Sequence, residues 1–357
     1  MLPPPQKILI INPFGIGDVL FTTPLISNIK AHWPSAGVGY LANARSAPIL
    51  ALNPKIDKVF IYERDEFNAV YRRSKIEFFQ KFRKFLEDIH AEQFDLAIDL
   101  SLNGNLSFLM WLIGIRKRVG FNYKNRSPLL TQKIPLEGYE SKHVVEYYLD
   151  ILTEIGVPAV RKRLEIFVPE ADKRWAESIW HKHGDLVHRK VVAIIPGGGA
   201  SWGKDAFYKR WPLENYAKLA DKIVEKFGAA IILMGDQNET VLCDEVAHLM
   251  RRSSVDLAGK TSITQLAALL ALCKAVVVND GGPLHVAVAA GAKTVSIFGP
   301  VDEKVYGPYP QENHVVITNG IACRPCYRRF RRAECGHVSC LTKLDVDEVA
   351  ERIGQIL

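Results

Sequence analysis

The stretch AVVVNDGGPLHVAVAAGAKTVSIFGP, residues 275–300, holds the signals that decide the fold. An apolar run, Val276 to Val278, ends in Asn-Asp-Gly-Gly; an apolar segment then opens with Pro283, and a second apolar run follows from Thr294. Proline suits the first helical position because its missing N–H has no helical partner there. The pattern predicts a buried strand, a tight turn, a helix and a second strand. Short apolar strands linked by helices are typical of parallel sheets covered on both faces.

The same alternation continues along the whole chain. Strands are expected within residues 7–12, 37–43, 58–62, 94–100, 191–199, 229–236 and 254–259. Helices are expected over residues 19–33, 74–90 and 213–227, and from Glu239 and Thr264. The apolar run at 106–115 has ten residues, too few to span a membrane, and is expected to be a buried helix. The fold class is therefore α/β with doubly wound parallel sheets.

The chain divides into two halves of this kind. The polar stretch 169–190 is the expected junction, between an N-terminal domain at 1–170 and a C-terminal domain at 188–342. A final helix within 343–357 could pack back on the N-terminal domain. Two doubly wound domains that face each other would bind ligands in a cleft at the carboxyl ends of their strands.

Composition narrows the class of protein without naming it. The 357 residues are 48% hydrophobic and 24% charged, as in soluble globular proteins, and the net charge of +7 suggests an acidic partner. Nucleic acid, anionic lipid and phosphorylated sugar all fit that charge. The opening MLPPPQK has no apolar signal core, so a cytoplasmic location is expected. Six cysteines in so long a chain do not suggest a disulfide scaffold.

The first loop, INPFGIGDVL, carries two glycines and one carboxylate. Gly15 and Gly17 invite a dinucleotide interpretation, but that motif requires a third glycine where Leu20 stands and an acid after the second strand. A nicotinamide cofactor is therefore not favoured. Asp18 is expected in the first turn of the next helix, either as a helix cap or as a catalytic base.

The turn at 280–283 is expected to bind an anion. Backbone amides at the start of a helix point outward at the positive end of its dipole. His285 in the first turn could donate to a phosphate oxygen or be a structural histidine. Asp280 is expected to orient His285 or the neighbouring amides.

Two further loops are expected to reach the same site. Residues 197–201, ending at Ser201, could wrap a phosphate, and Lys209 or Arg210 could supply positive charge. Met234 could pack on an adenine face. Glu239 could accept hydrogen bonds from ribose hydroxyls or cap the next helix.

Taken together, these motifs resemble the lipopolysaccharide heptosyltransferases of glycosyltransferase family 9. The matching pieces are GIGDVLFTTPL, RVGFNYKNR, HVVEYYLDILTEIG, PGGGAS with KRWP, LMGDQNE, NDGGPLHVAVAAGAKTVSIFGP and CRPCYRRFRRAECGHVSCL, in order along nearly the whole chain. The resemblance implies the GT-B architecture, two Rossmann-like domains with the active site between them. It also implies inverting, metal-independent transfer of heptose from ADP-heptose to the inner core of lipopolysaccharide.

The resemblance assigns roles to individual residues. It implies that Asp18 is the general base and that Lys209 contacts phosphate. The diphosphate turn would be Asp280, Gly281, Gly282 and His285, with Glu239 and Met234 at the nucleoside and Ser201 in the phosphate loop. Family members often have Thr-Gly where this chain has Gly281-Gly282-Pro283, which removes one side-chain contact. Gly15, Gly17, Arg118 and His143 are the expected acceptor contacts.

The implied partners are a nucleotide-sugar donor, a lipid A–Kdo-type core acceptor and, transiently, the inner face of the cytoplasmic membrane. No nucleic acid, cofactor or metal is expected. Alternatives are a nucleotide-sugar epimerase or hydrolase of the same fold, transfer from another nucleotide sugar, and a sugar-binding protein that has no need of Asp18.

Two motifs could suggest a metal. Cys323, Cys326, Cys335 and Cys340, with His337, could hold zinc, but five arginines in the same loop favour reduced thiols. Asp345 and Asp347 form an Asp-x-Asp pattern that is better explained by a capping box, with Glu348, on the last helix.

Overall fold

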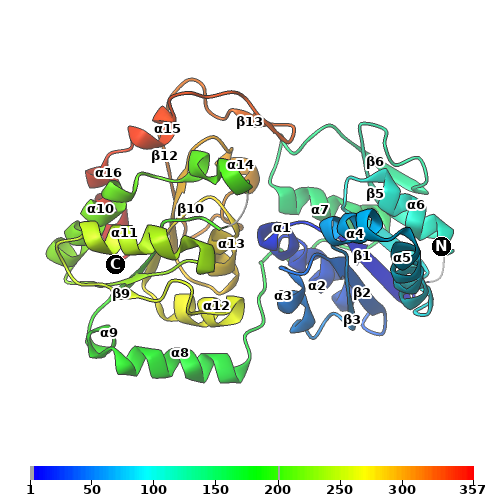
Figure 1. Cartoon of the computed structure of the whole chain (residues 1–357), viewed down its shortest axis with the longest axis horizontal. Coiled ribbons are helices and arrows are strands. Elements are labelled where there is room, and N and C mark those ends of the chain that lie inside the picture. The colour runs from blue at the N-terminus through cyan, green and yellow to red at the C-terminus, as the bar shows by residue number, and fades with distance from the viewer. Residues whose placement is uncertain (1–3, 200–201) are drawn as a thin grey trace. The chain divides into compact units, whose positions relative to one another are not determined.

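The computed structural model describes residues 4–199 and 202–357, which form two compact units. Unit 1 comprises Met1–Tyr139 with Val144–Lys162, and unit 2 comprises Glu140–His143 with Arg163–Leu357. Each unit contains one six-stranded sheet with helices on its faces (Figure 1).

The sheet of unit 1 is parallel throughout, with strand order β3-β2-β1-β4-β5-β6. Its strands are β1 (Lys7–Ile11), β2 (Gly37–Ala42), β3 (Lys58–Ile61), β4 (Leu96–Asp99), β5 (Lys117–Tyr123) and β6 (Gln132–Leu136). This is the doubly wound order, in which the chain changes direction between its first and fourth strands. Here the switch lies between β1 and β4.

Seven helices connect these strands in the described part of unit 1. They are α1 (Ile16–Leu20), α2 (Thr23–His32), α3 (Ala47–Ala51), α4 (Arg64–Arg73), α5 (Lys75–His90), α6 (Gly104–Leu112) and α7 (Val144–Glu154). One core joins α5 and α6 to the sheet through Leu9, Leu41, Ile89, Leu106 and Met110. The expectation of a buried helix at 106–115 is only half right, because Phe108, Trp111 and Leu112 on the outer side of α6 are 45–53% exposed.

The sheet of unit 2 repeats the same order, β12-β11-β10-β7-β8-β9. Its strands are β7 (Val191–Ile195), β8 (Ala230–Leu233), β9 (Val255–Asp256), β10 (Ala275–Asn279), β11 (Thr294–Phe298) and β12 (Val315–Thr318). The first and fourth strands of this unit, β7 and β10, pair in parallel, with Val278 opposite Ile195. The switch point of unit 2 therefore lies between them.

The other elements of unit 2 surround this sheet. They are α8 (Glu170–Lys182), α9 (Gly184–His188), η1 (Gly203–Lys209), α10 (Leu213–Phe227), η2 (Gln237–Glu239), α11 (Thr240–Leu249), α12 (Ile263–Leu272), α13 (Gly282–Ala289), α14 (Glu303–Tyr306), the hairpin β13 (Tyr327–Arg328) with β14 (Arg331–Arg332), α15 (Ser339–Thr342) and α16 (Val346–Gly354). The α10 helix matches its expected bounds, since it starts after Pro212 and ends at Gly228, whose φ of 64° is left-handed.

The unit boundary differs from the expected junction at 169–190. The α8 helix packs on α12, and Thr264 Oγ1 donates to Asp172 Oδ2 at 2.6 Å. Residues 163–187 therefore belong to unit 2 and not to a linker. A short segment, Glu140–His143, also belongs to unit 2 although the residues on both sides of it lie in unit 1.

The last helix, which was expected to pack back on the N-terminal domain, belongs to unit 2 and packs in its core. Val349, Ala350 and Ile353 of α16 are buried in the same core as α10. Lys222 Nζ on α10 lies 2.7 Å from Asp347 Oδ1. Asp345 caps α16 by accepting from Asp347 N. The Asp-x-Asp pair is thus engaged in helix contacts.

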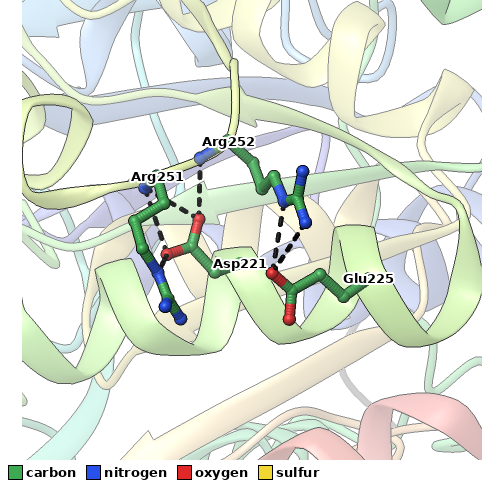
Figure 2. A network of polar contacts seen from close by, with 4 residues as sticks. All are labelled: Asp221, Glu225, Arg251 and Arg252. Carbon is green, nitrogen blue, oxygen red and sulfur yellow. Dashed lines mark hydrogen bonds and ion pairs between the residues drawn. The ribbon is translucent and has the colours of Figure 1, made fainter.

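The connection between α11 and β9 is fixed by a buried carboxylate on α10. Asp221, 3% exposed, accepts from the backbone N–H groups of Arg251 and Arg252 at 2.9–3.1 Å (Figure 2). Arg252 also pairs with Glu225, one turn further along α10. This network fixes where the chain enters β9. Within the described residues, no helix is both long and apolar enough to cross a membrane.

Candidate functional site

The strongest site in unit 2 lies at its topological switch point. The loop after β7, Pro196 to Gly199, and the turn after β10, Asp280 to Pro283, leave neighbouring parallel strands at the same sheet edge. Ligands of doubly wound sheets bind at this position. The two glycine-rich segments that the sequence singled out are therefore brought together.

These two segments approach so closely that side chains would not fit. A Cβ on Gly281 would lie 1.9 Å from the carbonyl oxygen of Gly198, and one on Gly199 would lie 3.0 Å from Pro283 Cδ. Gly198 and Gly199 also have left-handed φ values of 81° and 85°. The glycines thus create a backbone surface with little side-chain cover, and amides at the start of α13 can meet an anion there.

Asn279, a residue that the sequence analysis did not assign, holds the two segments together. Its Nδ2 donates to Pro196 O at 2.6 Å, and its Oδ1 accepts from Trp211 N and from the Tyr216 hydroxyl. The side chain is fully buried. The sequence did offer a signal for this role, because Asn279 is a polar residue directly after the apolar run Val276 to Val278.

Lys209 and Asp280 form a buried ion pair at the site. Lys209 Nζ lies 2.7 Å from Asp280 Oδ2, and the two side chains are 10% and 5% exposed. The same ammonium lies 4.4 Å from the ring centroid of Trp202. The expected cation is therefore present beside the anion turn. Asp280 contacts Lys209, in place of the expected role of orienting amides or His285.

His285 is a neutral residue in the first turn of α13. Burial lowers its pKa to about 3, with further lowering from the positive charges of His143 and Lys209. A neutral imidazole can still donate one hydrogen bond. His285 can therefore act as an uncharged donor toward an anion throughout the physiological pH range.

Glu239 joins the loop after β7 to the loop after β8. Its Oε1 accepts from Gly199 N at 2.8 Å, its Oε2 accepts from Asp236 N at 3.2 Å, and Arg210 lies 3.8 Å away. Burial raises the pKa of this carboxyl group. Glu239 is thus the N3 member of a capping box with Asp236 on η2, while it makes no side-chain cap on α11. Any contact with ribose would add to these bonds.

Two expected donor contacts do not gain support. Met234 is fully buried at the end of β8, so its side chain offers no surface to a nucleobase, and the expectation for it is corrected. Ser201 lies outside the described residues.

In unit 1 the equivalent turn follows β1 and carries Asp18. Gly15 is the N-cap of α1, and Asp18 lies in its first turn. Asn12 Nδ2 donates to the Asp18 carbonyl at 3.1 Å, and Asn43, from the end of β2, donates to Phe14 O at 2.5 Å. Both asparagines are buried. The turn with Gly15, Gly17 and Asp18 is therefore fixed from two strands.

Three buried tyrosines lie close enough to Asp18 to respond to its charge. Burial, with a further contribution from Asp18, raises the pKa values of Tyr40, Tyr139 and Tyr148. The Tyr40 hydroxyl lies 3.0 Å from Thr22 Oγ1. Asp18 is thus a half-buried acid close to three buried tyrosines, which is a suitable environment for a carboxylate base.

Asp99 is the other acid at this switch point, and its contacts are structural. It ends β4, and its carboxylate accepts from Ser101 N, Ser101 Oγ and Ser107 Oγ at 2.6–2.9 Å. Burial raises its pKa. These bonds fix the start of α6, so Asp18 remains the candidate base.

Arg118, an expected acceptor contact, is buried and binds backbone carbonyls. Arg118 is 9% exposed, and its guanidinium donates to the carbonyls of Ile115, Arg116 and Leu129. It therefore holds backbone together, and its acceptor role is corrected. Gly15 and Gly17 keep their predicted place at the carboxyl edge of the unit 1 sheet.

His143 lies in unit 2, where the sequence analysis did not place it. Its Nε2 is 3.1 Å from Gly307 O, and its ring stacks on Tyr309 with centroids 4.6 Å apart. Its charge also contributes to the low pKa of His285. The expected acceptor contact is thus revised to a residue beside the anion site.

The cysteine segment does not form a metal centre in the described residues. No three histidine, cysteine or acidic side chains gather there, or elsewhere in residues 4–199 and 202–357, in an arrangement that could hold a metal ion. All six cysteines are free thiols, and Cys340, on α15, is buried in the unit 2 core. The zinc interpretation therefore gains no support.

Comparison with known proteins agrees with this geometry. The model of glycosyltransferase family 9 (heptosyltransferase) matches residues 82–337. The chain is 26% identical to lipooligosaccharide heptosyltransferase 2 of Haemophilus ducreyi and 24% identical to lipopolysaccharide heptosyltransferase 2 of Escherichia coli, each over 99% of both chains.

Solved structures show the same architecture. A family 9 glycosyltransferase from Veillonella parvula superposes with a TM-score of 0.78 at 21% identity, covering 98% of this chain and 97% of that one. The ADP-heptose LPS heptosyltransferase II of Escherichia coli gives 0.75 at 23% identity, with 98% of both chains covered. The fold is GT-B. Since the family model spans well over half of the sequence, the chain belongs to glycosyltransferase family 9 and is a glycosyltransferase.

Proposed function

We propose that this enzyme transfers heptose from ADP-heptose to the inner core of lipopolysaccharide, with inversion at the anomeric carbon and without a metal ion. The observation that carries the proposal is the convergence of the Pro196–Gly199 loop, the Asp280–Pro283 turn and Lys209 at the switch point of unit 2. Family membership, and relatives named for heptose transfer to lipopolysaccharide or lipooligosaccharide, support the choice of substrate.

The donor half of the reaction is assigned to unit 2. The leaving ADP gains negative charge as the glycosidic bond breaks, and fixed donors stabilise that charge. The start of α13 and neutral His285 supply an oriented dipole and a hydrogen-bond donor, and Lys209 offsets the charge of Asp280 beside them. These groups carry the charge of the leaving group, so the proposal requires no divalent cation.

The acceptor half is assigned to unit 1. An inverting transfer is one displacement in which the acceptor hydroxyl loses its proton as it attacks. Asp18 takes that proton in the proposed mechanism, because it is the half-buried acid at the switch point of unit 1 whose turn is held from two strands. Gly15 and Gly17 let the acceptor sugar approach the backbone beside it. The enzyme would act at the inner face of the cytoplasmic membrane.

The test is a donor panel combined with an Asp18→Asn variant. Wild-type protein should transfer heptose from ADP-heptose to a defined core acceptor in the presence of EDTA, with an inverted product by NMR. Asp18→Asn should lower kcat by at least about 10³-fold while ADP binding stays within about twofold. Transfer from a different nucleotide sugar only, or a fully active Asp18→Asn, would overturn the proposal. Release of free sugar at full rate without acceptor would favour an epimerase or hydrolase.

A further inference from the structure

An exposed apolar corner stands out on unit 1, where α4 meets α5. Ile76 is 73% exposed, Phe79 64% and Tyr71 46%. Arg72, Arg73 and Lys75 lie between and beside them. We call these six residues the hairpin tip.

The inner side of the same helix pair is already packed. Phe78 stacks on Phe82 with centroids 5.4 Å apart, and Phe67 meets both rings edge-on. Lys81 pairs with Glu66 across the two helices, and Ser74 caps α5 by accepting from Glu77 N. Phe79 meets Phe78 edge-on with centroids 5.6 Å apart, but Phe79 and Ile76 remain 64% and 73% exposed, so most of their apolar surface faces outward.

The hairpin tip lies on the functional side of unit 1. The chain leaves β3 at Ile61, on the carboxyl edge of the sheet, and enters α4 at Arg64. It returns along α5 toward Leu96, at the amino edge, where β4 starts. The tip, at the end of α4 and the start of α5, thus stays on the carboxyl side, the side on which Asp18 follows β1.

The charge of the hairpin tip indicates which kind of surface it can bind. Residues 71–79 contain three cations and one acid, Glu77, in a chain of net charge +7. Exposed aromatic and aliphatic side chains with flanking lysine and arginine are the pattern of interfacial binding to anionic lipid. The exposed face of α6 is also apolar, but α6 itself, Gly104–Leu112, carries no charged residue, and the nearest cations after it are Arg116 and Lys117.

We infer that the hairpin tip docks unit 1 on an anionic bilayer surface, inserting Ile76 and Phe79 and holding the Asp18 edge close to an acceptor that is anchored in the same bilayer. The identity of the acceptor rests on the proposed function. Binding to the bilayer itself does not.

The first test measures sedimentation of the full chain with vesicles of equimolar phosphatidylcholine and phosphatidylglycerol. Wild type should bind, and should bind about tenfold less to pure phosphatidylcholine. Ile76→Ser/Phe79→Ser and Arg72→Glu/Lys75→Glu should each lose at least about tenfold in binding. The matched control is Val160→Ser, a 79% exposed apolar residue of unit 1 outside the tip. Since all these side chains are exposed, thermal unfolding should be unchanged.

Hydrogen exchange provides a readout without substitutions. Vesicles should slow exchange over residues 71–80 of wild type and leave the α10 region as it was. Vesicle binding that survives both tip variants, or protection elsewhere with none at the tip, would overturn the inference. So would a tip-dependent dimer that excludes vesicles.

Activity assays with two forms of the acceptor test membrane docking and the proposed function separately. On a lipid-free core oligosaccharide the tip variants should match wild type, and on vesicle-embedded acceptor they should lose about tenfold in kcat/KM. Vesicle binding by the tip without any heptose transfer would leave docking intact and reject the proposed function. Normal transfer with equal use of both acceptor forms by the tip variants would reject docking alone.

Discussion

Lys209 and Asp280 form a buried ion pair, with Nζ 2.7 Å from Oδ2, beside the turn assigned to the diphosphate. An acid at an anion site would repel its ligand unless its charge were balanced. Lys209 supplies that balance and leaves the amides at the start of α13 as the net attractive feature. The pair therefore explains why a carboxylate is compatible with this turn.

Removing Lys209 alone should destabilise the fold more than replacing both members of the pair. Lys209→Met leaves a buried carboxylate unpaired, so we expect the free energy of unfolding to fall by about 3 kcal/mol and ADP affinity to fall at least about tenfold. Lys209→Met/Asp280→Asn should recover much of the stability. Urea unfolding and calorimetric ADP titration measure the two quantities. Additive stability losses in the double variant would contradict the pairing.

Gly281→Ala tests the close approach of the two loops. The added Cβ would lie 1.9 Å from Gly198 O, which is backbone and cannot rotate away. We expect a loss of about 2 kcal/mol in stability, with strongly weakened ADP binding. Gly320→Ala is the matched control, because a Cβ there meets no atom within 4 Å. Equal behaviour of the two variants would show that the loops do not require a bare backbone.

The protonation of His285 predicts how stability depends on pH. Its pKa is about 3 in the folded chain and 6.5 in its ordinary state, so the unfolded chain takes up the proton first as pH falls. The stabilisation is complete above pH 6.5 and is lost as pH falls from 6.5 toward 3, by on the order of 5 kcal/mol.

Histidine-selective NMR provides the direct check. The His285 ring should show no titration between pH 8 and pH 5, and acid unfolding should begin at lower pH in His285→Gln if that variant folds. A ring that titrates near pH 6.5 would show that His285 is charged in part of the working range.

Arg118 should affect stability and not acceptor recognition. Its guanidinium donates to two carbonyls before β5 and to Leu129 O in the connection from β5 to β6, so Arg118→Met leaves these acceptors unpaired and should cost about 2 kcal/mol. The KM for acceptor should stay within about twofold of wild type at a temperature where the variant is folded. A raised KM with unchanged unfolding would restore the acceptor role.

The alternation of strands and helices could be predicted because each buried strand is a short apolar run closed by glycine or polar residues. Ser74 and Pro212 mark where α5 and α10 begin, and both helices match their expected bounds closely. The anion turn was predictable for the same local reason, since Pro283 and two glycines determine its backbone. These features depend on neighbours in sequence.

The errors concern contacts between distant residues. Arg118 donates to Leu129 O, eleven residues away, as well as to the nearby carbonyls of Ile115 and Arg116, and the sequence does not reveal the fold of the chain that brings Leu129 back to it. His143 lies in unit 2 because four residues leave unit 1 and return to it, which no composition change marks. The polar stretch at 169–190 looked like a linker because most of α8 is exposed, although its inner side packs on α12.

Both sheets have the same strand order, so the turn that carries Asp18 and the Pro196–Gly199 loop hold equivalent places, each directly after the first strand of its sheet. The chain thus repeats one scaffold and gives its copies opposite electrical character, acidic in one and receptive to anions in the other. Under the proposed function, evolution can alter donor preference by changing loops in one copy while the other keeps its sugar acceptor, which is one physical route to the diversification of such enzymes.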